Sequence, residues 1–599
     1  MRVALAIAVL VSACGAEPAT HEGCGERCGP RFDACDERSI AIAGGGCEPV
    51  GVPDGACAKG FRSDGRGGCA AILPAAPCDP GSVAFLGEDR CHPIAPCGDG
   101  PWGSIPTDAS TVFVDATNAG ASDGTRERPF KTITEALAVA KIGAVVAVAA
   151  GRYAESLTFT RPVRLFGACP TKVEIAGSLV SPVDVELHDL AITGGGVLVG
   201  GKTSLDRVWV HDVSAEGVRV EPIPRGETAV VVRRSLIERA SGAGVTLVGD
   251  GVTLEDVVVR GTRPRSSAGG LGVHVGIIEP TRPSTLRARG LVVEQVTGVG
   301  INVVASRAEL DGALIRDVAL RKDGLFGNGI LVSDEAGKPR PALGARGVVI
   351  ERVHVAGVIA HRADVSLSHL SLRDVDVDRD EMLGLGIQVT GDTELTLADS
   401  VIERVRYGGV FVRGARAVME RTIVRDVAAQ KATGVGGVGV WTLVRDGVPP
   451  VVTVSRSRVL RTVTAGVFGI GGTLAVSECT IGDIAARPFD ARFGDGVVIS
   501  GEQVGPLATR VPGTLELSGT SIHGCARAGL SVQAAALHMR DSALMCNAID
   551  LALSWRVAPD AEPSPFTLDD GGGNGCGCAT IGRCVASPTE LAPVEGPNL

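Results

Sequence analysis

Four aspartates alternate with other residues in one short segment of the chain. They are Asp374, Asp376, Asp378 and Asp380, in the sequence RDVDVDRDE. An extended backbone points alternate side chains to one face, and carboxylate oxygens are the ligands that Ca²⁺ prefers. The segment is therefore a candidate calcium site. A solvated polar loop without a metal is the alternative interpretation.

Basic residues form a second set of candidates. They lie in five Gly-containing segments, and their cationic groups could bind an extended polymer or a partner protein. These residues are Arg263, Arg265, Arg321, Lys322, Arg379, Lys431, Arg487 and Arg492. The alternative is that the segments are duplicated loops without a ligand.

The start of the chain has the layout of an export signal. Arg2 precedes a short apolar run, and Val11-Ser12-Ala13-Cys14 follows. The run is too short to span a bilayer. The segment resembles a bacterial lipobox, which implies that Cys14 carries a lipid and that Gly15 directs the protein to the outer membrane, facing the periplasm or the cell surface. An ordinary signal peptide cleaved near Ala16 is the alternative.

The cysteine content also predicts export. Of 17 Cys, removing Cys14 leaves 16, an even number compatible with complete pairing in an oxidising compartment. Nine of them lie before Pro106, in a segment with too few apolar residues to build a core without disulfides. A metal site at Cys24-x3-Cys28 is a less favoured interpretation of part of this segment.

Two disulfide pairs can be suggested, although the sequence does not settle the connectivity. Because nine is an odd number, one partner of the N-terminal cysteines should lie farther along, and Cys169 is a candidate partner of Cys97. Cys525 and Cys546 occupy nearly the same phase of successive repeats, where stacking would bring them together.

A two-part repeat must position all these residues. Units of 13 residues, such as 235–247 and 400–412, alternate with units extended by six or seven residues, such as 422–441. A short unit and its connector make 22 residues, enough for three strands and three turns. This predicts a solenoid of about 14 rungs, stacked about 4.8 Å apart.

The extensions fall at one phase of every second rung, so they should project from one edge of the rod. They cover 261–270, 320–327, 377–384, 430–437 and 487–494. Two rungs separate neighbours by about 9 to 10 Å. Longer connectors after these units predict a second ridge, with a valley between the two that would suit an extended polysaccharide or an envelope protein.

Composition excludes one class of partner. Aromatic residues are only 3% of the chain and the formal net charge is −10, with no basic stripe to neutralise phosphates. Nucleic acid is therefore not an expected partner. The shortage of aromatics also disfavours a sugar-cleaving cleft with stacking platforms.

The segment 111–159 reads as strand, loop, amphipathic helix and strand. It contains Asp123-Gly124-Thr125, then PFKTI at 129–133, then Glu135-Ala136-Leu137, then Gly151-x-Tyr153-x-Glu155. These motifs resemble the N-terminal cap of pectin-lyase-like proteins, and the Cys-rich segment is similar to the leader of bacterial lipoproteins of this type. The resemblance implies an all-β, right-handed parallel β-helix. It also implies a possible enzyme, in which Asp-bound Ca²⁺ works with a basic residue such as Arg373 or Arg379.

The expected organisation has four parts: a signal peptide at 1–13, a disulfide-stapled segment at 14–106, the β-helix at 107–555, and a Cys/Gly-rich cap or tail at 556–599. We expect a non-catalytic binding or structural protein of the cell envelope. A Ca²⁺-dependent polysaccharide lyase or a glycoside hydrolase acting in the groove between the loop ridges is the alternative.

Overall fold

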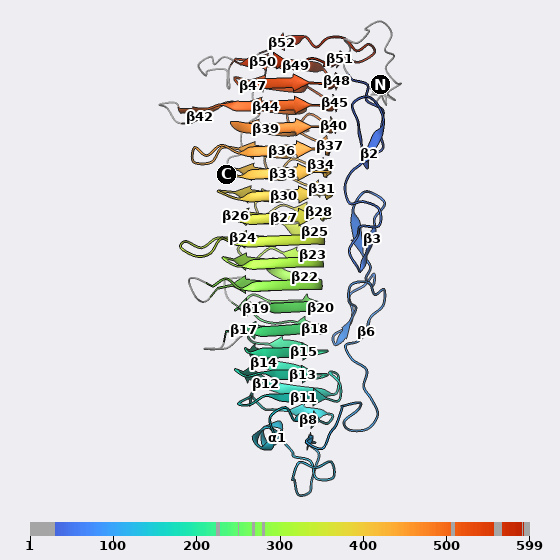
Figure 1. Cartoon of the computed structure of the whole chain (residues 1–599), viewed down its shortest axis with the longest axis vertical. Helices are drawn as coiled ribbons and strands as arrows, with labels where there is room; N and C mark the ends of the chain where they lie inside the picture. Colours follow the sequence, from blue (N-terminus) through green and yellow to red (C-terminus); the bar gives the residue numbers. More distant parts are fainter. Residues whose placement is uncertain are drawn as a thin grey trace, which may run out of the picture.

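The chain forms one elongated coil of short parallel strands (Figure 1). The computed structural model describes residues 30–222, 228–249, 251–265, 270–277, 282–504, 509–555, 566–589 and 591. Each turn of the coil adds one strand to each of three stacks, called here sheets A, B and C in chain order. Strands of one sheet pair in parallel with those of the neighbouring turns, so the predicted parallel β-helix is confirmed.

The strands of each sheet follow one another along the rod. Sheet A contains β7 (Val112–Val114), β8 (Val145–Val148), β11 (Val163–Gly167), β13 (Val185–His188), β15 (Lys202–Asp206), β27 (Asp364–Ser368), β30 (Glu394–Ala398), β33 (Arg416–Glu420), β36 (Val451–Ser455), β39 (Gly472–Ser477), β44 (Gly513–Ser518), β47 (Ala536–Arg540) and β50 (Thr567–Asp570). Sheet B contains β9 (Gly151–Tyr153), β16 (Trp209–Val213), β28 (Ser371–Asp376), β31 (Val401–Val405), β34 (Ile423–Val427), β37 (Arg458–Thr462), β40 (Thr480–Gly482), β45 (Ser521–His523), β48 (Ala543–Met545) and β51 (Gly575–Gly577). Sheet C contains β10 (Leu157–Thr158), β17 (Val218–Val220), β19 (Ala243–Val248), β21 (Gly270–Gly276), β24 (Asn328–Ser333), β26 (Ala356–His361), β29 (Leu385–Thr390), β32 (Gly408–Arg413), β35 (Val438–Leu443), β38 (Ala465–Ile470), β41 (Asp495–Ser500), β46 (Ala528–Gln533), β49 (Ile549–Ser554) and β52 (Ala586–Pro588).

Longer strands turn a corner and serve more than one sheet. They are β12 (Val173–Ser181) and β14 (Ala191–Val199) in sheets B and C, β18 (Ala229–Glu238), β20 (Val252–Arg260), β23 (Arg307–Ala319) and β25 (Ala342–His354) in sheets A and B, and β22 (Thr285–Val304) in all three. A separate antiparallel hairpin, β42 (Glu502–Val504) and β43 (Thr509–Val511), projects from a connector between sheets C and A.

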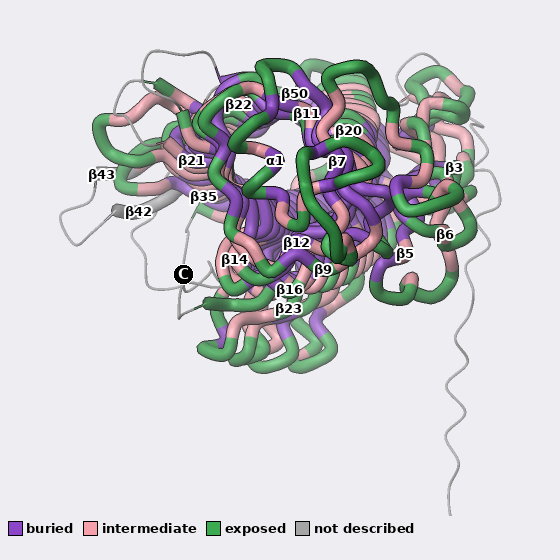
Figure 2. Tube along the Cα trace, turned by 90° about the horizontal axis from the view of Figure 1, so that it is seen from below, coloured by how far each residue is buried: buried purple, intermediate pink, exposed green. Residues whose placement is uncertain are grey.

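The 22-residue period sets the register. Leu395 pairs with Ala417 and Leu397 with Met419, so apolar side chains of successive rungs stack inside the coil. Figure 2, seen along the long axis, shows these buried residues lining the inside of the coil. The corners carry residues with positive φ, such as Asp399 (50°) and Arg404 (51°), which turn the chain within a single residue.

The N-terminal cap is built around α1 (Ile133–Val139), close to the range expected from the sequence. Thr132 and Glu135 form a capping box, and the Glu155 carboxylate accepts hydrogen bonds from the N–H groups of Ile133 and Thr134. Ile133 and Ala136 are buried against the first rung. The helix therefore covers the end of the sheet stack.

The C-terminal end differs from the expected boundary at residue 555. The strands β50, β51 and β52 pair in parallel with β47, β48 and β49, so the tail forms a further rung of the coil. Short Gly-rich turns allow this, and disulfides Cys546–Cys578 and Cys576–Cys584 staple it.

The cysteine pairing is partly as expected. Cys97 is bonded to Cys169, at the N-terminal end of the rod. The suggested pair of Cys525 with Cys546 is wrong, because Cys525 is a free buried thiol and Cys546 bonds to Cys578. Cys479 is also free and buried, so pairing is not complete. The packing explains both: these thiols point into the apolar core among inward side chains. Cys14, Cys24 and Cys28 lie outside the described residues.

The Cys-rich segment from residue 30 to 106, called here the arm, lies along the outside of sheet B (Figures 1 and 2). It consists of three antiparallel hairpins, each closed by one disulfide. These are β1 (Ser39–Ala41) with β2 (Cys47–Pro49), β3 (Phe61–Ser63) with β4 (Cys69–Ala71), and β5 (Ser82–Val83) with β6 (His92–Pro93). The arm runs opposite to the coil, starting beside its C-terminal rungs and ending at its N-terminal cap.

Apolar contacts hold the arm on sheet B. Val52, Phe61 and Phe85 pack with outward residues of sheet B such as Leu236 and Leu314, and both of the latter are fully buried. The arm thus gives this face a second, smaller core. In the described part of the chain, no helix is long and apolar enough to cross a membrane.

Candidate binding groove

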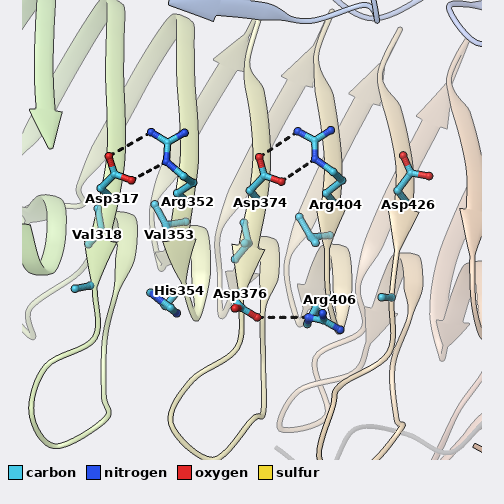
Figure 3. Close-up of a pocket in the computed structure, with 14 residues that line it drawn as sticks. Asp317, Val318, Arg352, Val353, His354, Asp374, Asp376, Arg404, Arg406 and Asp426 are labelled. Carbon is cyan, nitrogen blue, oxygen red and sulfur yellow. Dashed lines mark hydrogen bonds and ion pairs between the residues drawn. The ribbon is translucent and has the colours of Figure 1, made fainter. Parts of the chain in front are cut away.

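A groove runs along the rod between the arm and the row of loops (Figure 3). It has a volume of about 730 Å³ and lies where the strands of sheet B end and the loops begin. The residues that line it are Asp317, Val318, Ala319, Arg352, Val353, His354, Asp374, Val375, Asp376, Arg404, Val405, Arg406, Asp426 and Ala428. They come from five successive rungs, so the groove is about 20 Å long.

The loops of the long rungs form one wall, as their phase in the sequence predicted. Arg379 donates a hydrogen bond to the carbonyl oxygen of Lys322 at 3.4 Å, joining two of the loops. A Cβ added to Gly434 would lie 3.0 Å from the Cβ of Phe489, so two other loops also touch. Neighbouring loops therefore support each other along the edge of the rod.

The floor of the groove carries ion pairs that each join two adjacent rungs. Arg352 binds both carboxylate oxygens of Asp317, at 2.6 and 3.2 Å, and Arg404 binds both oxygens of Asp374, at 2.7 and 3.1 Å (Figure 3). Asp426, at the far end, is bound in the same way by Arg461. Such bidentate pairs fix the orientation of both side chains.

The backbone explains why these side chains reach the groove. Asp317, Arg352, Asp374, Arg404 and Asp426 all have φ between 51° and 58°, in the left-handed region. A residue in this conformation breaks the alternation of a strand, so its side chain turns away from that of the residue before it. The preceding residue at each of these positions faces the arm instead.

Under the arm, a second ladder of charges runs parallel to the first. Arg425 donates hydrogen bonds to Glu403 at 2.6 and 2.9 Å and to the carbonyl oxygen of Arg66 at 2.9 Å. Arg373 likewise bonds Glu351 and the carbonyl oxygen of Cys69. The arm covers the first member of each of these Glu-Arg and Arg-Asp pairs, and only the second member opens to the groove.

Asp376 is the most highly charged point of the groove. Its carboxylate lies 3.3 Å from the Lys431 ammonium and 3.4 Å from Arg406. Burial favours a raised pKa for Asp376, but the Val377 N–H and the Lys431 ammonium outweigh it and lower the pKa below its ordinary value. His354 lies beside this cluster and donates its Nδ1–H to the Val377 carbonyl oxygen at 3.1 Å.

The expected calcium cage is not formed. Asp374 is bound by Arg404, Asp376 by Lys431 and Arg406, and Asp378 accepts the N–H groups of Asp380 and Met382 in a turn. The segment is not a continuous strand, because Asp374 has a φ of 58° and β28 ends at Asp376. Among the described residues, no three His, Cys, Asp or Glu side chains are placed to hold a metal ion.

The basic loop residues have several environments. Arg321 pairs with Asp323 and stacks on Phe326, and Arg487 is buried against Asp490 and Phe493, so these two arginines brace their own loops. Lys431 reaches the groove. The remaining residues, Arg263, Arg265, Lys322, Arg379 and Arg492, are exposed on the loops.

The valley expected between the two ridges is filled in its C-terminal half. Its floor is the outward face of sheet C, where Trp441 contacts Phe411 edge-to-face and Phe468 at a tilt, at centroid distances of 5.7 and 5.9 Å, and all three are fully buried. Loop residues such as Phe493 pack over them. The few aromatic residues of the chain thus support the loops from below.

Sequence reasoning missed most of the residues that line the groove. Asp317, Arg352, Arg404, Arg406 and His354 were not singled out. The available signal was their position, since each lies at or just after the end of the second strand of its rung, before the chain continues to the third strand. Their position in the sequence does not show, however, that the arm leaves these residues uncovered.

Acidic and basic side chains are paired along the groove. Each aspartate named on the groove floor is paired with an arginine or a lysine, whereas a glycoside hydrolase needs one carboxylic acid whose pKa is raised. Burial does raise the pKa of Asp495 and of Asp550, but neither lines the groove. The groove instead offers fixed hydrogen-bond donors and acceptors side by side.

Fold and groove together define a parallel β-helix protein with a lateral groove. A family model described as a protein of unknown function (DUF1565) matches residues 116–181, the cap and the first rungs. A search of curated proteins found no significant match.

Several solved structures are similar to this chain. The periplasmic alginate epimerase AlgG is 10% identical with a TM-score of 0.35, over 59% of this chain and 76% of that one. The catalytic unit of a GH87 alpha-1,3-glucanase from Streptomyces thermodiastaticus is 16% identical with a TM-score of 0.31, over 81% and 71%. The pectate lyase Pel9A is 11% identical with a TM-score of 0.20, over 75% and 81%. Likenesses of this size leave substrate and reaction open.

Proposed function

We propose that this protein is an exported, lipid-anchored scaffold of the outer membrane that binds an extended polysaccharide along the groove without cleaving it. The observation that carries the proposal is the set of matched Asp–Arg pairs on the groove floor. Cys14 is the proposed site of lipid attachment.

The groove chemistry suits a chain of hydroxyl groups. Each bidentate pair leaves carboxylate lone pairs and guanidinium N–H groups beside one another, so a sugar hydroxyl can both donate and accept. The pairs recur every second rung, about 10 Å apart, which is comparable to an extended unit of two sugar rings. A linear polysaccharide could therefore form the same hydrogen bonds with each ion pair along the groove.

Because the charges on the groove floor neutralise one another, the groove should bind neutral polysaccharides better than polyanions. Arg352, Arg404 and Lys431 are all engaged with aspartates, so binding a polyanion would require breaking these pairs. A neutral polysaccharide can add hydrogen bonds to the pairs as they stand.

A Ca²⁺-dependent lyase or a glycoside hydrolase is the second class considered. A lyase would require a metal site and an unpaired base near it. In the described part of the groove, Asp374 and Asp376 are bound by basic residues, and Arg373 is held by Glu351 under the arm. The binding role is therefore better supported.

A panel of neutral and anionic polysaccharides, each with and without Ca²⁺, tests the proposal. Binding would be measured by affinity electrophoresis, and cleavage by new reducing ends and by ultraviolet absorbance of unsaturated products. We expect retardation by at least one neutral polysaccharide with no product. Release of products, or no binding to any member of the panel, would refute the proposal.

A further inference from the structure

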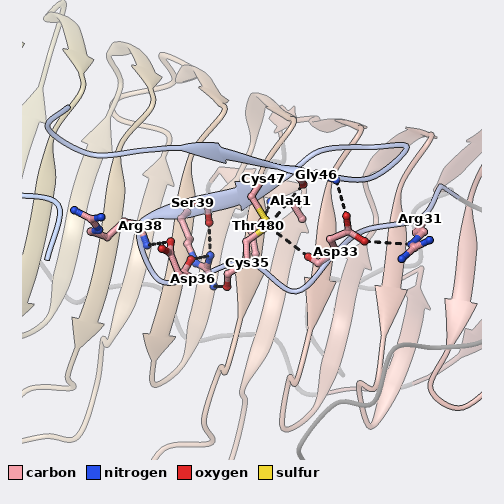
Figure 4. The surroundings of a disulfide bond; sticks show 11 residues. Arg31, Asp33, Cys35, Asp36, Arg38, Ser39, Ala41, Gly46, Cys47 and Thr480 are labelled. Atoms are coloured by element: carbon pink, nitrogen blue, oxygen red, sulfur yellow. Dashed lines mark hydrogen bonds and ion pairs between the residues drawn. A yellow bond between two sulfur atoms is a disulfide. The ribbon is translucent and has the colours of Figure 1, made fainter. Parts of the chain in front are cut away.

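The direction of the arm places its first hairpin and Cys97 toward opposite ends of the rod. The first hairpin lies on the C-terminal rungs, where the Ala41 N–H donates to Thr480 Oγ1 at 3.2 Å (Figure 4). Arg458 donates to carbonyl oxygens of the same hairpin, including that of Cys35 at 3.5 Å. The arm ends at Cys97, which is bonded to Cys169 at the N-terminal cap.

This placement limits where the lipid can lie. Residue 30 is the first described residue, and the 15 residues from 15 to 29 lie between it and Cys14. Whatever its conformation, a chain of that length reaches at most about 55 Å. The rod is longer, at about 80 Å from the first to the last rung.

The C-terminal end also exposes apolar side chains. Trp555, Leu568 and Val585 are 47%, 42% and 76% exposed on the last two rungs. Tryptophan is enriched where proteins meet the headgroup region of a bilayer. Val139 and Ile142 are exposed at the opposite end. Exposed apolar residues therefore do not distinguish the two ends of the rod, whereas the length of the tether, the chain between Cys14 and residue 30, does.

We propose that the C-terminal end of the rod is the surface that faces the lipid bilayer, and that the rod stands on it with the capping helix α1 as its distal tip. This inference rests on the lipid anchor in the proposed function. It makes the last rung the contact surface for lipid, and the groove then runs along the membrane normal on the side of the rod. A ligand would bind beside the rod, within the rod's length of about 80 Å from the bilayer.

Photo-crosslinking to lipid tests the orientation with three matched positions. Val585, Ile142 and Phe489 are 76%, 78% and 76% exposed, at the C-terminal end, at the cap and on the loop row. Each would be replaced singly by p-benzoylphenylalanine in the full lipidated chain, which is then reconstituted into vesicles of phosphatidylethanolamine and phosphatidylglycerol. Lipid adducts are counted by mass spectrometry after irradiation.

We expect about tenfold more lipid adduct at Val585 than at Ile142 or Phe489, because the tether is shorter than the rod. Equal or greater adduct at Ile142 would overturn the end-on orientation, and equal adduct at Phe489 would show that the rod lies on its side. Failure of the wild-type chain to float with the vesicles would instead refute the lipid anchor, and the inference with it. The Cys14→Ala variant, which should not float, is the control for the anchor.

Discussion

Adjacent residues of this protein have different roles because of one backbone angle. At Glu351-Arg352 and Glu403-Arg404, the glutamate lies under the arm and the arginine, with a φ of 52° or 51°, turns into the groove. One dipeptide therefore contributes both to holding the arm and to lining the groove. Substitutions at the two positions should have separable effects.

The buried pair of Glu403 with Arg425 predicts a large loss of stability. Both side chains are almost fully buried, so Arg425→Met leaves a buried carboxylate poorly compensated, at a cost of about 3 kcal/mol. Hydrogen exchange of the β31 and β34 amides would measure the free energy of local opening.

The exposed pair of Arg287 with Glu309 is the matched control, with side chains 63% and 65% exposed. Arg287→Met should cost less than about 1 kcal/mol at the neighbouring amides. Equal losses for the two variants would contradict the burial of Glu403 and Arg425.

The two free thiols predict a reactivity pattern. Burial raises the pKa of Cys479 to about 12 and raises that of Cys525 as well, so little reactive thiolate forms at neutral pH. Iodoacetamide should modify neither residue in the folded protein and both after unfolding without a reductant, as read by peptide mass spectrometry. Rapid modification of either one in the folded protein would place it at the surface.

At the scale of the elements, the alternation of short and long rungs also alternates charge. Short rungs carry Glu at the position under the arm and long rungs carry Arg, so Glu238, Arg260, Glu294, Arg316, Glu351, Arg373, Glu403 and Arg425 follow one another in register. At the next residue along each rung, which faces the groove, the order of the charges is reversed, and the long rungs carry Asp. A repeat of identical rungs would stack like charges about 4.8 Å apart, so the two-rung unit avoids this repulsion.

Reversing one charge tests this explanation of the alternation. Glu351 lies in register between Arg316 and Arg373, so Glu351→Arg would stack three guanidinium groups. We expect it to destabilise β28 by about 1 to 2 kcal/mol more than Glu351→Gln, which removes the charge alone. Hydrogen exchange of the β28 amides gives the comparison, and equal effects of the two variants would contradict the proposed role of charge order.

At the scale of the whole molecule, the sequence predicted the coil better than the groove. The 22-residue period, the capping helix and the phase of the loops follow from local patterns that repeat. The position of the arm depends on contacts between residues hundreds of positions apart, such as Phe61 with Leu314, and no periodicity encodes them. The calcium hypothesis assumed alternation through Asp374, where the backbone instead turns, and a local pattern of residues does not reveal such a turn.

The arm should loosen without unfolding the rod, because the inner core of the coil is separate from the cluster that the arm forms with the outside of sheet B. Replacing Cys57 and Cys69 together by alanine opens a loop whose closure contributes about 3 kcal/mol. We expect proteases to cut within residues 57–69 at least about tenfold faster, while the coil stays intact.

The Cys78→Ala, Cys91→Ala double variant should shift the cleavage to its own hairpin, which serves as the control. Digestion of the coil itself in either variant would show that arm and coil unfold as one unit.

The most direct test of the account measures where the polysaccharide binds. For a neutral polysaccharide found to bind, titration calorimetry would compare wild type with the groove variant His354→Ala, Arg406→Ala and with the variant Arg287→Ala, Arg346→Ala on the open face of sheet A. We predict at least about tenfold weaker binding for the groove variant only, equivalent to about 1.4 kcal/mol, and no cleavage products from any of the three proteins. Equal affinity of all three proteins, or products released by the wild type, would contradict the account.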